Sequence, residues 1–303
     1  MDLSIVIPVY EAENSLKKVV DELIADPFLK QLEWELIMVN DFSSDNSWKV
    51  IESLCQGNKH FLGISLHKNC GQHTATFVGL KEAKGKYLLT IDDDGEHPIA
   101  EISNMMDALK KEDADVVYAS PRKRKKSLFR KVASQGFKAS ARIFSDGYGN
   151  GSAFRLIDQS IYQQIQNHKT PFVFIDEILA WYTKNVVFLP MTFRMAGKPS
   201  TYRPTKLFGL FSDIMYTYSS FPAQFLTRIG FGGSLISLLL GIYFIIKKLF
   251  FKAQLGFTSI AVSILFSASV ILLGLGIIAQ YIYRQNRLLN EYPQYSIKHR
   301  TDE

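Results

Sequence analysis

The chain has 303 residues and a formal net charge of +6 at pH 7; 47% of the residues are hydrophobic and 21% are charged. This composition is compatible with a packed core, and the length allows one large or two small domains. The two cysteines, Cys55 and Cys70, form no recognisable disulfide framework and have no metal-binding spacing.

Short apolar runs alternate with amphipathic segments through the first 120 residues. We expect strands at 4–10, 34–41, 61–66, 87–94 and 114–120, and helices at 15–25, after Ser43 or Ser44, at 71–83 and at 99–111. This alternation predicts a mostly parallel, doubly wound α/β sheet with helices on both faces. The ligands of such sheets bind at the carboxyl ends of the strands.

Polar residues gather after these predicted strands, as expected for the rim of a ligand site. They are Pro8, Tyr10, Glu11, Asn40, Asp41, Lys68, Asn69, Asp92, Asp93 and Asp94. A G-x-G-x-x-G segment does not follow the first strand, and the chain has no G-x-x-x-x-G-K-[ST] segment. A dinucleotide cofactor and a P-loop enzyme are therefore not expected.

Three consecutive aspartates, Asp92 to Asp94, follow the apolar run at 87–91. Like charges at a strand end repel one another, so a cation would make the arrangement favourable. Mg²⁺ and Mn²⁺ prefer carboxylate and phosphate oxygens, and Mg²⁺ is commonly held by one or two carboxylates together with substrate phosphates. Asp92 and Asp94 can share such an ion if the strand breaks at Gly95. A solvated acidic turn is the alternative.

After residue 203 the sequence becomes apolar. Two runs without charged residues, 229–246 and 255–283, flank a short basic link at 247–254. As a helix the first run would reach about 27 Å, close to the thickness of a bilayer's hydrocarbon core. Within residues 225–283 we therefore expect two transmembrane helices, at about 229–246 and 257–281. Two buried helices of a globular domain are the alternative.

The distribution of positive charge predicts an orientation in the membrane. Arg228, Arg284, Arg287, Lys298 and Arg300 lie on one side of the predicted hairpin, and Lys247, Lys248 and Lys252 on the other. This bias favours a cytoplasmic location for residues 1–203 and for the tail at 284–303. No secretory signal precedes the first strand. We expect a multi-pass protein of the cytoplasmic (inner) membrane.

Two further segments have the character of membrane-surface helices. The basic run at 122–126 leads into an amphipathic segment at 127–144, and residues 204–224 precede the first predicted span. We expect both to lie along the lipid interface. A solvated surface helix is the alternative for 127–144. Binding of nucleic acid is not expected, because no nucleic-acid motif accompanies the charge.

Several blocks of sequence resemble one known family. They are SIVIPVYEAENSL, ELIMVNDFSSDNS, KNCGQHTATFVGLKEAKGKYLLTIDDDGEHP and DVVYASPRK, followed by FRLIDQSI, AGKPSTYRPTKLFGL and IIAQYIYR. Together they resemble family 2 glycosyltransferases with the GT-A fold. Within that family the blocks are most similar to the bacterial polyprenyl-phosphate glycosyltransferases, relatives of dolichol-phosphate mannose synthase. The resemblance covers nearly the whole chain and is more specific for fold than for substrate.

The resemblance implies a role for each matching residue. The residues implied to bind a nucleotide-sugar, a UDP-sugar in the first instance, are Pro8, Tyr10, Glu11, Asn40, Asp41, Asn69, Gln72, Asp92 and Asp93. Asp92 and Asp94 are implied to hold Mg²⁺ or Mn²⁺ on the diphosphate. The resemblance also makes Asp94 and Asp176 catalytic candidates, and Arg122 and Lys198 candidates for binding the acceptor or its phosphate. Arg155 and Arg203 are added for their positive charge, Arg155 as a catalytic and Arg203 as a phosphate-binding candidate.

Three positions depart from the family pattern. Asn40 replaces the first of two aspartates, Glu96 stands where a glutamine is common, and Ala153 stands where many members carry an aspartate. A hydroxyl acceptor would need a general base. A phosphate monoester is mostly dianionic at pH 7 and attacks without one, although it needs positive charge beside the donor. The missing carboxylate is therefore compatible with a lipid-phosphate acceptor.

We expect an inverting, metal-dependent transfer of a sugar from a nucleotide-sugar to polyprenyl phosphate, undecaprenyl phosphate in particular. One alternative is transfer to a glycan hydroxyl with Asp176 as the base. Asp176 can also have a purely structural role, because an acid in the first turn of a helix is stabilised by the helix dipole. Another is a membrane protein that binds a nucleotide-sugar without catalysis. The chain has no Q-x-x-R-W segment near Trp181 or after it, so a processive polysaccharide synthase is not expected. The sugar, the metal and the oligomeric state stay open, with a homo-oligomer among the options.

Overall fold

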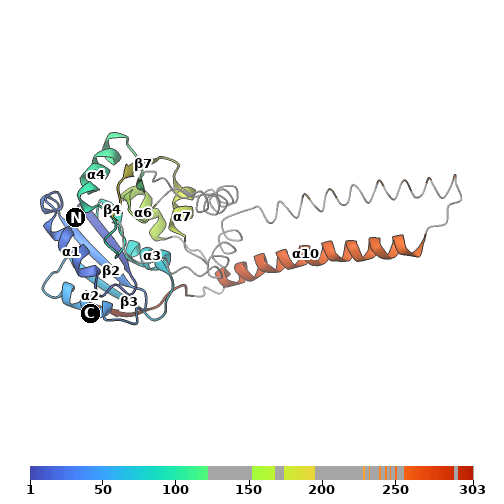
Figure 1. Cartoon of the computed structure of the whole chain (residues 1–303), viewed down its shortest axis with the longest axis horizontal. Helices are drawn as coiled ribbons and strands as arrows, with labels where there is room; N and C mark the ends of the chain where they lie inside the picture. The colour runs from blue at the N-terminus through green and yellow to red at the C-terminus, as the bar shows by residue number, and fades with distance from the viewer. Residues whose placement is uncertain are drawn as a thin grey trace. The chain divides into compact units, whose positions relative to one another are not determined.

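The computed structural model describes residues 1–121, 152–167, 174–194, 256–289 and 293–302, with single helical residues at 228, 232, 239, 243, 246 and 250 (Figure 1). The chain forms two compact units, one of Met1–Arg203 with Tyr292–Glu303 and one of Pro204–Glu291. The predicted interfacial segments at 127–144 and 204–224 lie outside the described residues, as does most of the predicted span at 229–246.

An eight-stranded sheet organises the first unit, in the order β7-β5-β6-β4-β1-β2-β3-β8. The strands are β1 (Leu3–Val9), β2 (Trp34–Asn40), β3 (Phe61–Leu66), β4 (Tyr87–Thr90), β5 (Val116–Pro121), β6 (Arg155–Asp158), β7 (Val186–Met191) and β8 (Ile297–Arg300). β1 to β4 pair in parallel, as do β5 and β7, whereas β6 and β8 run antiparallel to their neighbours. The prediction of a mostly parallel α/β sheet is confirmed.

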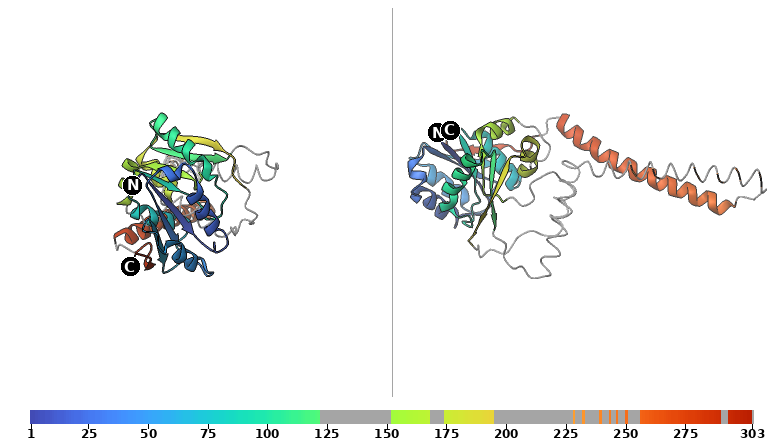
Figure 2. Two further views of the ribbon diagram at one scale, coloured as in Figure 1. Left: turned by 90° about the vertical axis from the view of Figure 1, so that its left-hand side faces the viewer. Right: turned by 90° about the horizontal axis from the view of Figure 1, so that it is seen from above.

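Helices cover both faces of this sheet, as its apolar central strands require. α1 (Leu16–Ala25), α2 (Ser47–Cys55) and α4 (Ile102–Lys111) share a core with Leu3, Ile5 and Ile7 of β1. α3 (Gln72–Glu82) contacts β1 and β2 on the other face, and α6 (Gln159–Gln166) contacts β4 and β6. α7 (Ile175–Tyr182) packs on α3 and α6. The right-hand view of Figure 2 shows the two groups of helices on opposite sides of the strands.

The structure corrects two predicted boundaries near the site and adds a strand that the sequence did not predict. β4 ends at Thr90, so the aspartates leave the ladder and form a turn in which Gly95 has φ +74°. α2 begins at Ser47 rather than directly after Ser43 or Ser44, because the Ser43 hydroxyl accepts the N–H of Glu11 instead. β6 inserts antiparallel between β4 and β5, so the fourth and fifth predicted strands are not neighbours.

The C-terminal residues return to the first unit and extend its sheet. β8 pairs with β3, and the N–H of Thr301 donates to the carbonyl of Gly63 at 3.0 Å. A Cβ on Gly63 would lie 2.8 Å from Cγ2 of Thr301, so the glycine permits this approach. Arg300 forms a bidentate ion pair with Glu82 at 3.0 and 3.1 Å. The predicted tail at 284–303 therefore ends as an edge strand.

The second unit contains α10 (Phe257–Leu289). In the part of the chain that is described, no helix meets the length and apolarity criteria for a membrane span, so the structure does not support the predicted transmembrane hairpin.

Candidate active site

The acidic turn after β4 is held from two directions. Oδ2 of Asp93 accepts the N–H of Tyr10 at 2.9 Å, which ties the turn to the end of β1. The carbonyl of Glu96 accepts the N–H of Arg194 at 2.8 Å, which ties it to the segment after β7. Inside the turn, Oδ1 of Asp94 accepts the N–H of Glu96 at 2.9 Å. These bonds give the turn a defined shape at the carboxyl edge of the sheet.

Asp92 is positioned by an amide and a histidine. Its Oδ1 accepts a hydrogen bond from Nε2 of Gln72 in the first turn of α3. Its N–H donates to Nδ1 of His97 at 3.1 Å, and Nε2 of His97 lies 3.7 Å from its Oδ2. The His97 ring stacks on Phe154 with centroids 5.1 Å apart and meets Phe193 edge-on at 5.3 Å. Burial lowers the pKa of His97 to about 4, so its imidazole is neutral at pH 7.

The electrostatics of this turn favour a bound cation. Burial, followed by the charges of Asp94 and Asp93, raises the pKa of Asp92 to about 7, and the Arg155 guanidinium acts in the opposite direction. The Arg155 guanidinium therefore compensates an ionised Asp92 only in part. Mg²⁺ or Mn²⁺ fits here, because Asp92 and Asp94 offer the oxygen donors these ions prefer. Among the described residues, no three His, Cys, Asp or Glu side chains are grouped so as to hold a metal by themselves.

The residues after β2 position the loop that precedes α3. Asp41 is 3% exposed, and its carboxylate accepts the N–H groups of Cys70 at 2.6 Å and Gly71 at 2.8 Å. Burial raises the pKa of Asp41, whereas these two bonds lower it. Nδ2 of Asn40 donates to the Ser65 hydroxyl at 3.1 Å. The sequence predicts Asn40 and Asp41 as nucleotide contacts, and the structure shows that both also organise the rim.

The other predicted nucleotide contacts differ in accessibility. Tyr10, Glu11, Asn69 and Gln72 are exposed at the carboxyl edge of β1 and β3 and at the start of α3. Pro8 is instead buried inside β1. The side chains of the exposed four are open to solvent, and all five stay predicted nucleotide contacts.

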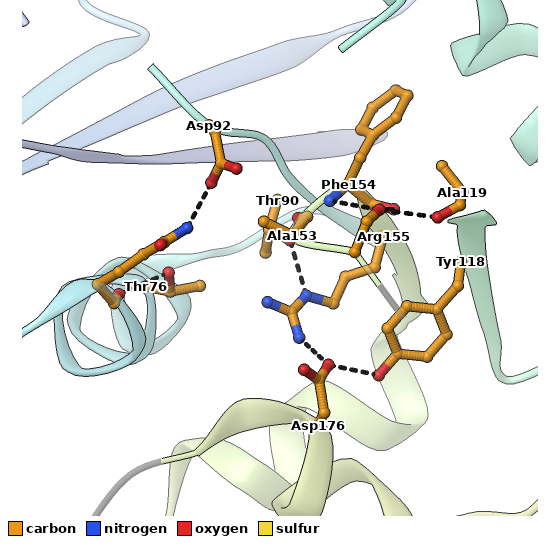
Figure 3. A network of polar contacts seen from close by, with 11 residues as sticks. Thr76, Thr90, Asp92, Tyr118, Ala119, Ala153, Phe154, Arg155 and Asp176 are labelled. Carbon is orange, nitrogen blue, oxygen red and sulfur yellow. Dashed lines mark hydrogen bonds and ion pairs between the residues drawn. The ribbon is translucent and has the colours of Figure 1, made fainter. Parts of the chain in front are cut away.

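A buried ion pair lies on the β6 side of the acidic turn (Figure 3). Arg155 is 2% exposed, and its Nη1 donates to Oδ1 of Asp176 in the first turn of α7. Its Nε donates to the Thr90 hydroxyl at 3.0 Å, and the Tyr118 hydroxyl donates to the same Oδ1 of Asp176 at 2.8 Å. One carboxylate oxygen thus joins β5, β6 and α7. Asp176 is the ion-pair partner of this buried guanidinium, and loss of either partner would leave an uncompensated charge.

Sequence reasoning missed two histidines at this site, His97 and His73. His73 lies on α3 with its ring 4.2 Å from that of Phe174, and its Nδ1 is buried without a hydrogen-bond partner among the described residues. Burial lowers the pKa of His73 to about 4. The charge of Asp176 raises this pKa, and the charge of Arg155 lowers it further. Each histidine directly follows a predicted site segment, and that adjacency was the available signal.

The predicted acceptor-binding residues Arg122, Lys198 and Arg203 lie outside the described residues. The described site residues meet along one edge of the sheet, from the loop before α3 to the start of α7. A mixed α/β sheet with an acidic D-x-D turn at this edge defines the class of GT-A glycosyltransferases.

The chain belongs to glycosyl transferase family 2, whose family model matches residues 4–178. It is 31% identical over 304 residues to the SfII prophage-derived bactoprenol glucosyl transferase of Shigella flexneri, covering 98% of each chain. It is 29% identical over 308 residues to the undecaprenyl-phosphate 4-deoxy-4-formamido-L-arabinose transferase of Proteus mirabilis strain HI4320, covering 98% of this chain and 93% of that protein. The protein is a glycosyltransferase.

A solved structure shows the same fold. The crystal structure of S. aureus TarS 1–349 in complex with UDP-GlcNAc matches with a TM-score of 0.50 at 16% sequence identity, covering 71% of this chain and 66% of that chain.

Proposed function

We propose that the protein transfers a sugar from a UDP-sugar to a polyprenyl phosphate, undecaprenyl phosphate in the first instance, with inversion at the anomeric carbon and with Mg²⁺ or Mn²⁺ bound. The observation that carries the acceptor is the full-length similarity to relatives named as bactoprenol and undecaprenyl-phosphate transferases. The observation that supports the donor is the acidic turn, where the charge of Asp92 is only partly compensated by Arg155.

The donor diphosphate would lie against this turn. When bound, Mg²⁺ or Mn²⁺ supplies positive charge that stabilises the departing nucleoside diphosphate. Gln72 orients the Asp92 carboxylate, His97 accepts the Asp92 backbone N–H, and the bonds from Tyr10 and Arg194 keep the turn in place. Such fixed geometry contributes to catalysis because little reorganisation is needed during the reaction.

The contacts of Asp176 with Arg155 and Tyr118 bear on the chemical class of the acceptor. Oδ1 of Asp176 already accepts hydrogen bonds from Arg155 and Tyr118, so this oxygen is engaged in holding β5, β6 and α7 together. A phosphate monoester needs no base: its oxygen forms the bond to the anomeric carbon while the bond to the diphosphate breaks. This arrangement favours a phosphate over the alternative glycan hydroxyl and supports Asp176 and Arg155 as positioning residues.

We further propose that the protein resides in the cytoplasmic membrane, with the sheet facing the cytoplasm. The support is the pair of uncharged runs at 229–246 and 255–283 in the sequence. Chain connectivity adds a constraint, because residues before 203 and residues 292–303 belong to one unit. Any crossing of a membrane between them must occur an even number of times, as in a hairpin.

The test is a transfer assay with the purified full-length protein, Mn²⁺, undecaprenyl phosphate and a panel of nucleotide-sugars. Mass spectrometry of the extracted lipid identifies donor and acceptor together, and the anomeric configuration of the product reports inversion. We expect a glycosylated lipid phosphate from a UDP-sugar. A product on a glycan hydroxyl instead, or no transfer from any donor, would overturn the proposal.

Asp94→Asn tests the metal role, with Asp107→Asn on the exposed face of α4 as the matched control. We expect the first change to lower the rate at least about 100-fold, of the order seen when one electrostatic group is lost, and the second to leave it unchanged. Full activity of Asp94→Asn would contradict the assignment of the metal to this turn.

A further inference from the structure

Two large aromatic side chains stand exposed at adjacent strand ends of the site. Tyr10, after β1, is 49% exposed, and Phe42, after β2, is 52% exposed. The two loops are joined directly, since the N–H of Asp41 donates to the carbonyl of Val9 at 2.9 Å and the N–H of Glu11 to the Ser43 hydroxyl at 3.0 Å. Tyr10 and Phe42 therefore occupy matching positions, each between the two bonded residues of its own loop.

The backbone of Phe42 is strained. Its φ is +59°, in the left-handed region that favours glycine and is unusual for a bulky residue. The residues on either side leave little room for relaxation: the Asp41 carboxylate is bonded to the N–H groups of Cys70 and Gly71, and the N–H of Ser43 donates to Oδ1 of Asn40 at 3.2 Å. Strain that the surroundings enforce in this way is concentrated at functional sites.

Among the described residues, no aromatic ring packs against Phe42 to compensate for this arrangement. The Phe42 ring is half exposed and makes no ring contact with another residue in the described part of the chain. A glycine would adopt the same backbone without strain and without exposing an apolar ring. The position therefore acquires a favourable role only when a ligand covers the ring.

The order of the strands indicates which part of a nucleotide donor could reach the Phe42 ring. β1 lies between β4, which precedes the acidic turn, and β2, which precedes Phe42. Two strand spacings amount to about 10 Å, a separation suited to the diphosphate and the base of an extended nucleotide. On the other side of β4 lie β6 and Arg155. With the diphosphate at the acidic turn, the nucleoside therefore extends over β1 and β2, and the sugar points toward Arg155.

We propose that Phe42 is a base-stacking residue: its ring covers one face of the donor's nucleobase, next to Tyr10. This inference rests on the proposed function, because it needs a nucleoside diphosphate at the acidic turn. Stacking is tolerant of base identity, so Phe42 contributes affinity for a planar base, and the choice among bases falls to other contacts at the rim.

The test compares Phe42→Gly and Phe42→Trp with the wild type by calorimetric titration of the full chain in Mn²⁺, with UDP and with inorganic pyrophosphate as probes. We expect Phe42→Gly to raise the dissociation constant for UDP about 5- to 100-fold, of the order found for loss of one base–aromatic stack. The dissociation constant for pyrophosphate should stay unchanged. Phe42→Trp keeps an aromatic ring, so its dissociation constant for UDP should stay close to that of the wild type.

Asp113→Gly is the matched control. Asp113 also has positive φ, +48°, but lies exposed between α4 and β5, away from the carboxyl edge. Both glycine variants should melt at or above the wild-type temperature, because each relieves backbone strain. Only Phe42→Gly should lose affinity for UDP, which separates stacking from a change in folding.

Two results would overturn the inference: unchanged UDP binding by Phe42→Gly, or an equal loss of affinity for pyrophosphate. Failure of the proposed function is recognised separately, since the wild-type protein would then bind no UDP at all.

Discussion

Replacement of Asp92 by asparagine should stabilise the metal-free protein while abolishing its activity. The pKa of Asp92 is raised to about 7, whereas an unfolded aspartate titrates near 3.8. For an acid whose folded pKa is raised, the ionised form is the one that folding disfavours. The penalty is therefore absent below about pH 4, grows as the pH rises, and is complete above about pH 7.

The magnitude follows from the difference in pKa. About three pKa units at 1.36 kcal/mol each give up to about 4 kcal/mol at pH 8. The side chain is 26% exposed, so this value is an upper estimate. With about 2–4 °C per kcal/mol for a domain of this size, Asp92→Asn should raise the melting temperature by up to roughly 8–16 °C at pH 8.

The assay is thermal unfolding of the full chain in EDTA from pH 4 to pH 8. The advantage of Asp92→Asn should shrink as the pH falls and vanish near pH 4, whereas Asp107→Asn should track the wild type throughout. Addition of Mn²⁺ and UDP should stabilise the wild type and not the variant. A variant no more stable than the wild type at pH 8, or a difference independent of pH, would refute the reasoning.

Three further predictions follow from the described contacts. Arg155→Met should lower the free energy of unfolding by about 3–5 kcal/mol, because it leaves Asp176 without its buried partner. Adding Asp176→Leu should recover part of that loss. Equal thermal stability of Arg155→Met and the wild type would speak against a stabilising pair. The pKa of His97 is lowered to about 4, so stability that is present above about pH 6.5 should fall by about 3 kcal/mol as the pH drops to 4, and acid titration by circular dichroism of His97→Gln should lack this component. Gly63→Val would place Cβ 2.4 Å from Cγ2 of Ile51 and 2.8 Å from Cγ2 of Thr301, so hydrogen exchange of β8 should accelerate; unchanged protection would mean that the strand tolerates the side chain.

The alternation of helices and strands in the first 120 residues was predictable because it depends on local periodicity. Phe61–Leu66 is a strand as predicted, and the first strand and helix differ from prediction by one residue at their ends. β6 was not foreseen as an antiparallel insertion, because four residues carry too little pattern to select their partners. Its place follows from pairing with Thr90 at the end of β4 and with Tyr118 in β5.

The candidate site was predictable where its chemistry is written in consecutive residues, as in Asp92 to Asp94. It was not predictable where a role depends on a distant partner. Asp176 was a candidate base in the sequence, and only the fold shows that it is paired with Arg155, 21 positions earlier. Asp41 likewise was a candidate nucleotide contact, and the fold shows that it also anchors the N–H groups of Cys70 and Gly71.

The sequence by itself determined the α/β class, the acidic turn and membership of the glycosyltransferase family, because apolar periodicity and short motifs are local properties. Only the tertiary structure decided which charges meet. The fold brings Gln72 to Asp92 and the N–H of Tyr10 to Asp93, and it encloses Arg155 with Asp176. A buried charge must find a partner that is close in space, wherever that partner lies along the chain.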